Sequence, residues 1–167
     1  MSPIELSVET DAVDPIDIVE HMAESHRWSF DRVDEDQIAM VVEGQWRSYS
    51  VTLAWDPDDE VLRLICSFEM SPPQGRLSVL HDVLNAANDE CWLGAFTYWS
   101  AAELMVYRYG LSLAGGQVAD SAQIGRMISA AVSNTERFYP AFQLAGWGDC
   151  TPAEAMQIAI SEAYGHA

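Results

Sequence analysis

Short segments in which apolar and polar residues alternate, separated by tight turns, constrain the fold of this chain more than any other feature. Clear alternations occupy residues 38–42, 49–55 and 62–68, and a shorter one begins at Trp28 and Phe30. Acidic, glycine and proline residues mark the turns between them, at residues 34–36, 43–45 and 56–59. A repeat of two directs one face of each segment into a core, and connections this short require antiparallel pairing. The sequence therefore predicts a meander of four antiparallel strands.

A helix is predicted on each side of this meander. Asp14 is placed to cap a helix over residues 15–26, with Pro15 at the first helical position, where its missing N–H has no partner to lose. After Pro72-Pro73, leucines at three- and four-residue steps predict a second helix over residues 77–91.

The carboxyl-terminal half adds two strands and two helices. Alternating residues predict strands over 96–98 and 105–111, and Thr151-Pro152-Ala153-Glu154 has the pattern of a capping box that begins a terminal helix. Between them, a long helix follows Gly115-Gly116 and ends at 146–148. Its inward positions are Ile124, Ile128, Ala131, Thr135, Phe138 and Phe142. Pro140 lacks the N–H that would bond to Glu136, so we expect it to interrupt and kink this helix.

The predicted order of elements is α-β-β-β-β-α-β-β-α-α. An antiparallel sheet meander with helices packed on it belongs to the α+β class. We assign residues 14–167 to a single domain and residues 1–13 to a flexible acidic leader.

The charge balance restricts the partners. The chain has 26 acidic residues against eight basic ones, all of them arginine, and a net charge of −18. Nucleic acids and anionic membranes attract clustered lysine and arginine, so neither is an expected partner. The acidity either favours a basic protein surface or serves solubility alone. With no signal peptide and no apolar run of membrane length, the protein is expected to be cytoplasmic.

The residues offer little for catalysis. Without lysine the chain can form neither a P-loop nor a Schiff base. Its three cysteines lack the paired spacing of a zinc site, and His21 and His26 lie on different faces of their helix. Cys66 and His81 could approach each other as a catalytic pair, but a structural role is favoured for both. We therefore expect no enzyme, no cofactor and no metal.

Aromatic residues are the remaining candidates for a site. Most lie at the ends of predicted elements or beside turns, where they either seal the core or form a protein-interaction surface. The candidate surface consists of Trp46, Trp55, Trp92, Trp99, Phe138, Tyr139 and Trp147.

Several of these residues stand in motifs that resemble a known family. The motifs are residues 14–20, 28–32, 92–96 with Trp99, 136–143, and Trp147-Gly148, and the most specific is Phe138–Gln143. Over about residues 14–163 the chain is similar to the YbjN family of bacterial proteins, in the version found in alphaproteobacteria. The resemblance implies a fold like that of type III secretion chaperones, a curved antiparallel sheet with packed helices that is often paired into a homodimer. The family is sometimes labelled a sensory transduction regulator, and it offers no catalytic residue to carry over.

The leading hypothesis is a non-enzymatic protein-binding module, a chaperone-like or regulatory adaptor that holds a client protein and pairs as a homodimer. Secretion chaperones, which the fold resembles, are typically acidic and hold an extended client segment. Two alternatives remain open. One is a small-molecule sensor or weak enzyme that uses a pocket between sheet and helices. The other is a structural role in which the terminal helix docks on a partner subunit through Met156, Ala159, Ile160 and Ala163.

Overall fold

The structure is a computed structural model that describes residues 14–165, with side chains described for residues 14–161. Its elements are α1 (Pro15–Ser25), β1 (Ser29–Asp34), β2 (Gln37–Glu43), β3 (Ser48–Asp56), β4 (Val61–Glu69), a 3-10 turn (Gln74–Arg76), α2 (Leu77–Asp89), β5 (Ala95–Trp99), β6 (Leu104–Ser112), α3 (Ser121–Trp147) and α4 (Pro152–Gly165). The predicted α+β class and element order are confirmed. The prediction for residues 1–13 lies outside the described residues, as does the side chain of Ala163.

The six strands form one antiparallel sheet in the order β1-β2-β3-β4-β6-β5. The first four are consecutive neighbours, as the short turns predicted. The chain then leaves β4, passes through α2, and enters the sheet again at its far edge as β5. β6 returns antiparallel between β5 and β4, so the last strand of the sequence lies inside the sheet.

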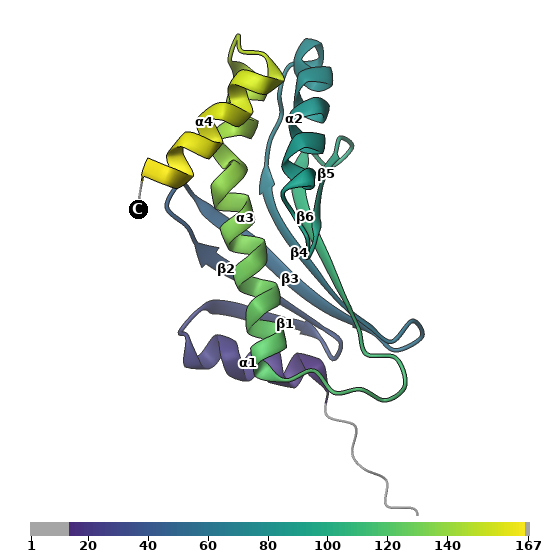
Figure 1. The fold of residues 1–167 in the computed structure, drawn as a ribbon. Coiled ribbons are helices and arrows are strands. Elements are labelled where there is room, and N and C mark those ends of the chain that lie inside the picture. Colours follow the sequence, from purple (N-terminus) through teal and green to yellow (C-terminus); the bar gives the residue numbers. More distant parts are fainter. Residues whose placement is uncertain (1–13, 166–167) are drawn as a thin grey trace, which may run out of the picture.

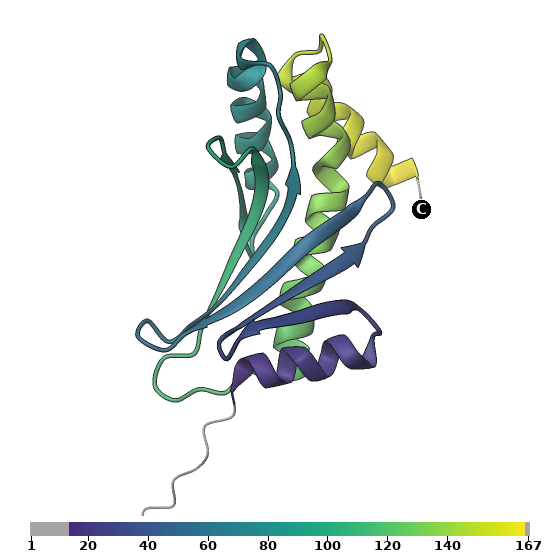
Figure 2. The same cartoon turned by 180° about the vertical axis from the view of Figure 1, so that it is seen from behind.

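The helices pack on one face of the sheet. α3 runs across the strands and α1 lies beside its amino-terminal end, whereas the view from behind shows a sheet face with no helix over it (Figures 1 and 2). Burial follows the predicted alternation along β3, where Tyr49, Val51 and Leu53 are fully buried and the intervening Ser50 and Thr52 are not. The core therefore lies between the helices and one side of the sheet, and no helix within residues 14–165 covers the other side.

α3 is one continuous helix of 27 residues that contains Pro140. The predicted interruption is wrong, because the helix continues to Trp147. Phe138, Ala141 and Phe142 are fully buried on both sides of the proline, so their packing holds the backbone helical where one hydrogen bond is lost. No helix within residues 14–165 is both long and apolar enough to cross a lipid bilayer.

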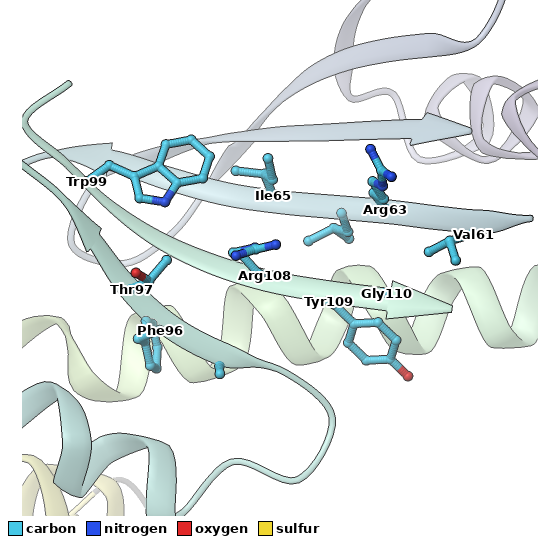
Figure 3. A pocket seen from close by; sticks show the side chains of 11 residues that line it. Val61, Arg63, Ile65, Phe96, Thr97, Trp99, Arg108, Tyr109 and Gly110 are labelled. Carbon is cyan, nitrogen blue, oxygen red and sulfur yellow. The ribbon is translucent and has the colours of Figure 1, made fainter. Parts of the chain in front are cut away.

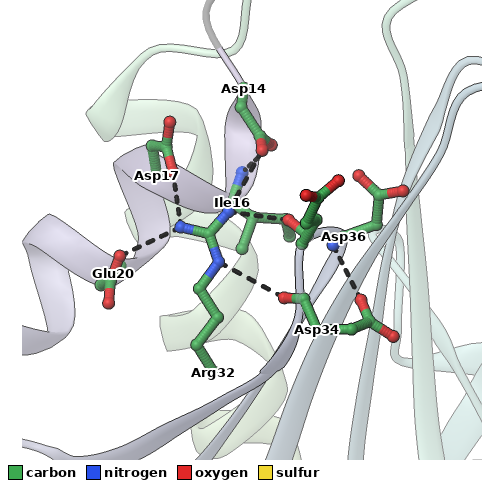
Figure 4. A network of polar contacts seen from close by, with 8 residues as sticks. Asp14, Ile16, Asp17, Glu20, Arg32, Asp34 and Asp36 are labelled. Carbon is green, nitrogen blue, oxygen red and sulfur yellow. Dashed lines mark hydrogen bonds and ion pairs between the residues drawn. The ribbon is translucent and has the colours of Figure 1, made fainter.

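Arg32 of β1 anchors α1 to the sheet. Asp14 caps α1 as predicted, with its carboxylate 2.9 Å from the amide nitrogen of Ile16. The guanidinium of Arg32 pairs with Asp14 at 3.2 Å, Asp17 at 2.5 Å and Glu20 at 3.1 Å (Figure 4). These hydrogen bonds and charges raise the pKa of Arg32, with the contact to Asp17 the strongest cause. One cation from the edge strand thus offsets part of the negative charge of three carboxylates at the start of α1.

Candidate functional site

The helix-free face of the sheet carries a groove of about 750 Å³ over β4, β6 and β5 (Figure 3). Its side chains come from alternate positions of three adjacent strands, chiefly Val61, Arg63, Ile65, Thr97, Trp99 and Arg108. The groove is mixed in character, with an indole and aliphatic side chains beside two guanidinium groups. A groove of this volume is large enough for a ligand or a short stretch of a partner chain.

Over β3, β4, β6 and β5, the outward positions of this face carry as many arginines as carboxylates, whereas the whole chain has a net charge of −18. The outward positions of β3, β4, β6 and β5 include two arginines, Arg63 and Arg108, and carboxylates occur among them only where a strand ends, at Asp56 and Glu69. The other outward positions carry small, hydroxyl or apolar side chains. In a chain of net charge −18, a stretch of sheet whose middle carries two arginines and no carboxylate is a distinct local feature.

The two arginines are diagonal neighbours across β4 and β6. Arg63 lies opposite Gly110, and Arg108 lies opposite Ile65 two positions further along. Arg63 is held by Asp56 at 2.5 Å and Asp59 at 3.1 Å, both through Nη2, so its Nε and Nη1 make neither contact. Arg108 is exposed and makes no ion pair with any residue between 14 and 161. The groove therefore presents guanidinium donors that the described protein leaves available.

The sequence-based candidate surface does not form one patch. Phe138 is fully buried, so its assignment to a surface is wrong. It lies on the side of α3 that faces the sheet, and its ring packs edge to face against Phe96, with the ring centroids 5.9 Å apart. Trp55 and Tyr139 are half-buried and pack against the core. These three residues seal or fill the core, which is the other role that their positions allowed.

The four remaining tryptophans are exposed but scattered. Trp92 is 95% exposed between α2 and β5, and Trp147 is 52% exposed at the end of α3. Trp46, in the β2–β3 turn, stacks on Tyr139 with ring centroids 6.5 Å apart. Trp99 lines the groove. The structure therefore places one of the seven candidates in the groove.

The motif of residues 136–143 joins α3 to the β2–β3 hairpin through its first residue, Glu136. The carboxylate of Glu136 accepts hydrogen bonds from the amide of Gln45 at 2.8 Å and from the phenol of Tyr49. A side chain on Gly44 would collide with both partners, since its Cβ would lie 2.2 Å from Oε1 of Glu136 and 2.6 Å from the Tyr49 ring. This part of the motif is structural.

The suggested Cys66–His81 pair does not form. Cys66 is buried beneath α3, where its sulfur lies 3.7 Å from the hydroxyl of Thr135, and burial raises the pKa of the thiol to about 11. His81 is exposed on α2. A thiol with a raised pKa is a poor nucleophile. No cluster of three or more potential metal ligands occurs in the described part of the chain.

A second hollow of about 320 Å³ lies between α1, β2 and α3. It is the kind of pocket between sheet and helices that a small-molecule sensor would need. Its walls include Met22, Trp28, Ile128 and Val132, and neither Cys66 nor His81 lines it. The residues suggested for a weak enzyme are therefore not the residues of this pocket.

Sequence reasoning missed Arg63 and Arg108. A signal was present in the sequence. Both arginines stand at the outward positions of their strands, between the residues whose alternation forms the inward face. Finding the groove also required the pairing of β4 with β6, which are separated in sequence by α2 and β5.

Comparison with known proteins identifies the family. The family model YbjN, described as "Putative bacterial sensory transduction regulator", matches residues 15–144. The solved structures include a similar chain titled "Crystal structure of YbjN, a putative transcription regulator from E. coli". It is 14% identical, with a TM-score of 0.50, and the match covers 72% of this chain and 85% of that one. The comparison with curated proteins found no match. At this identity the neighbour supports the fold, and the family model, which spans most of the chain, shows that the protein belongs to the YbjN family.

Proposed function

We propose that this protein is a non-enzymatic regulatory adaptor that binds a segment of a partner protein on the helix-free face of its sheet. The observation that carries the proposal is the groove over β4, β6 and β5, which combines an exposed indole, aliphatic side chains and two arginines. Tryptophan and arginine are enriched where proteins bind each other. The descriptions of the family and of its solved relative as regulators support a regulatory role.

A protein segment suits the groove better than a small metabolite. The hollow is only half enclosed, and its lining is spread along β4, β6 and β5, whereas small-molecule sites usually enclose most of their ligand. An extended chain can lie along paired strands and place alternate side chains against them. The absence of a reactive cysteine–histidine pair among the described residues supports a role in binding rather than in catalysis.

The proposal includes a homodimer and a protein client. Exposed Trp92 and Trp147 do not line the groove, so they are candidates for a dimer contact outside it. Sedimentation at micromolar concentration is expected to give twice the 18.5 kDa mass of one chain. A strictly monomeric mass would remove the dimer from the proposal without affecting the groove.

Site-specific photocrosslinking tests the groove as a client site. A benzophenone amino acid replaces Thr97, which lines the groove, and in a control protein it replaces His81, which is exposed on α2. In the native cells, the Thr97 probe is expected to crosslink one or a few proteins that the His81 probe does not. Identical products from both positions, or none from Thr97, would contradict the proposal.

A further inference from the structure

We infer that the groove recognises an acidic, extended segment of the partner protein, with a carboxylate placed against Arg108. The inference rests on the proposed function and gives the partner its chemistry. It is opposite to the expectation from net charge, which favours a basic partner.

The first support is local charge complementarity. Among the arginines of the described residues, Arg32, Arg63 and Arg137 have carboxylate partners on the protein itself. Arg108 stands exposed in the middle of β6, and no carboxylate occupies an outward position beside it on β4 or β5. A guanidinium offers five donors in a planar fork that fits a carboxylate. The guanidinium of Arg108 is therefore available to bind a carboxylate of another molecule.

The second support is spacing. Arg63 and Arg108 are diagonal neighbours on adjacent strands, and the Cα atoms of such a pair lie about 7–8 Å apart. In an extended chain, side chains at i and i+2 point to the same side and are separated by about 6.7 Å. When one acidic residue of the segment meets Arg108, a second one two positions along would therefore reach Arg63, where it would share the guanidinium with Asp56 and Asp59. Trp99, at the β5 side of the groove, offers an indole face to an apolar side chain of the same segment.

Because the net charge of the chain is −18, the affinity of the groove for an acidic peptide should depend on the salt concentration. At about 10 mM salt the screening length is about 30 Å, so the acidic remainder of the molecule repels an acidic peptide. At about 0.15 M salt the screening length falls to about 8 Å, so the peptide meets mainly the charges nearest to it, among which Arg108 has no carboxylate partner within residues 14–161. Affinity is therefore expected to rise between these two concentrations, unlike that of an ordinary cationic site.

Three fluorescent peptides of equal length test the inference on the full chain. Each alternates valine with a second residue, which is glutamate in the acidic peptide, glutamine in the neutral one and arginine in the basic one. Fluorescence anisotropy at about 0.15 M salt is expected to show tightest binding of the acidic peptide. Arg108→Gln should weaken that binding about tenfold. Arg126→Gln, which removes an exposed arginine of α3 and alters net charge equally, should leave it unchanged.

Each other result has a defined meaning. Tighter binding of the basic peptide would overturn the acidic preference and leave the adaptor function standing, while crosslinking at Thr97 tests that function separately. Equal loss of affinity in Arg108→Gln and Arg126→Gln would assign the effect to net charge and overturn the site. Citrate or phosphate that displaces the acidic peptide at equal concentration would make the groove a small-anion site. In a further variant, Glu9 is changed to glutamine and Asp11 to asparagine. If the acidic peptide binds this variant but not the unchanged protein, the groove is occupied by residues 1–13 of the chain itself, and the assignment to a partner protein is overturned.

Discussion

The carboxylate of Glu136 on α3 accepts a hydrogen bond from the phenol of Tyr49 on β3, linking the longest helix to the centre of the sheet. The same carboxylate accepts hydrogen bonds from the backbone amides of Gln45, at 2.8 Å, and Trp46, at 3.4 Å. Both residues lie in the turn between β2 and β3. One side chain thus satisfies three donors from the turn and the strand that follows it. The hairpin is thereby held at a fixed distance from α3.

Replacing Glu136 by alanine is expected to lower the free energy of unfolding by about 1–3 kcal/mol, because the buried phenol of Tyr49 would lose its partner. Urea unfolding followed by circular dichroism measures the change. Glu24→Ala, at an exposed position of α1, is the matched control and should stay within about 0.5 kcal/mol. Equal losses in both variants would show that Glu136 does not hold the hairpin.

Gly44→Ala should destabilise the protein through the same contact. The added Cβ would meet both the Glu136 carboxylate and the Tyr49 ring, and the ring cannot move because it is fully buried. We expect a loss of about 1–3 kcal/mol in unfolding free energy. Gly75→Ala is the control, since nothing lies within 4 Å of its Cβ position. A Gly44→Ala protein as stable as Gly75→Ala would contradict the close approach of hairpin and helix.

Tyr49 should make the fold sensitive to alkaline pH. Burial, followed by its bond to Glu136, raises the pKa of Tyr49 well above its ordinary value near 10. The stability that this shift represents is fully present below about pH 10, where both states keep the proton, and is lost as the pH rises further. Between pH 9 and pH 11, Tyr49→Phe should lose about 1 kcal/mol less unfolding free energy than the unchanged protein. Equal losses, measured by urea unfolding at both pH values, would show that Tyr49 ionises as freely in the folded state.

Local patterns predicted the elements well, because each depends on neighbours in sequence. The alternation of β3 gave its buried face, and Asp14 gave the start of α1. The second helix was predicted to reach Cys91 but ends at Asp89, where the chain turns toward β5. Features that depend on distant pairing were not predicted: the position of β6 between β4 and β5, and the groove with two arginines that this pairing creates. Phe138 was also assigned to the candidate surface, although the helical spacing had given it an inward position, and the structure confirms the inward position.

The three cysteines offer a last test of the structure. Cys66 is completely buried, and burial raises its pKa to about 11, whereas Cys91 and Cys150 are partly accessible. Thiolate is the reactive form, so Cys66 should resist modification while the protein is folded. With a chromogenic disulfide reagent at pH 8, the native protein and Cys66→Ala should release the same amount of chromophore in the rapid phase. In urea the unchanged protein should then react at one more thiol than Cys66→Ala. A rapid native phase that shrinks in Cys66→Ala would show that this thiol is accessible, and the packing of α3 over β4 would have to be looser than the structure indicates.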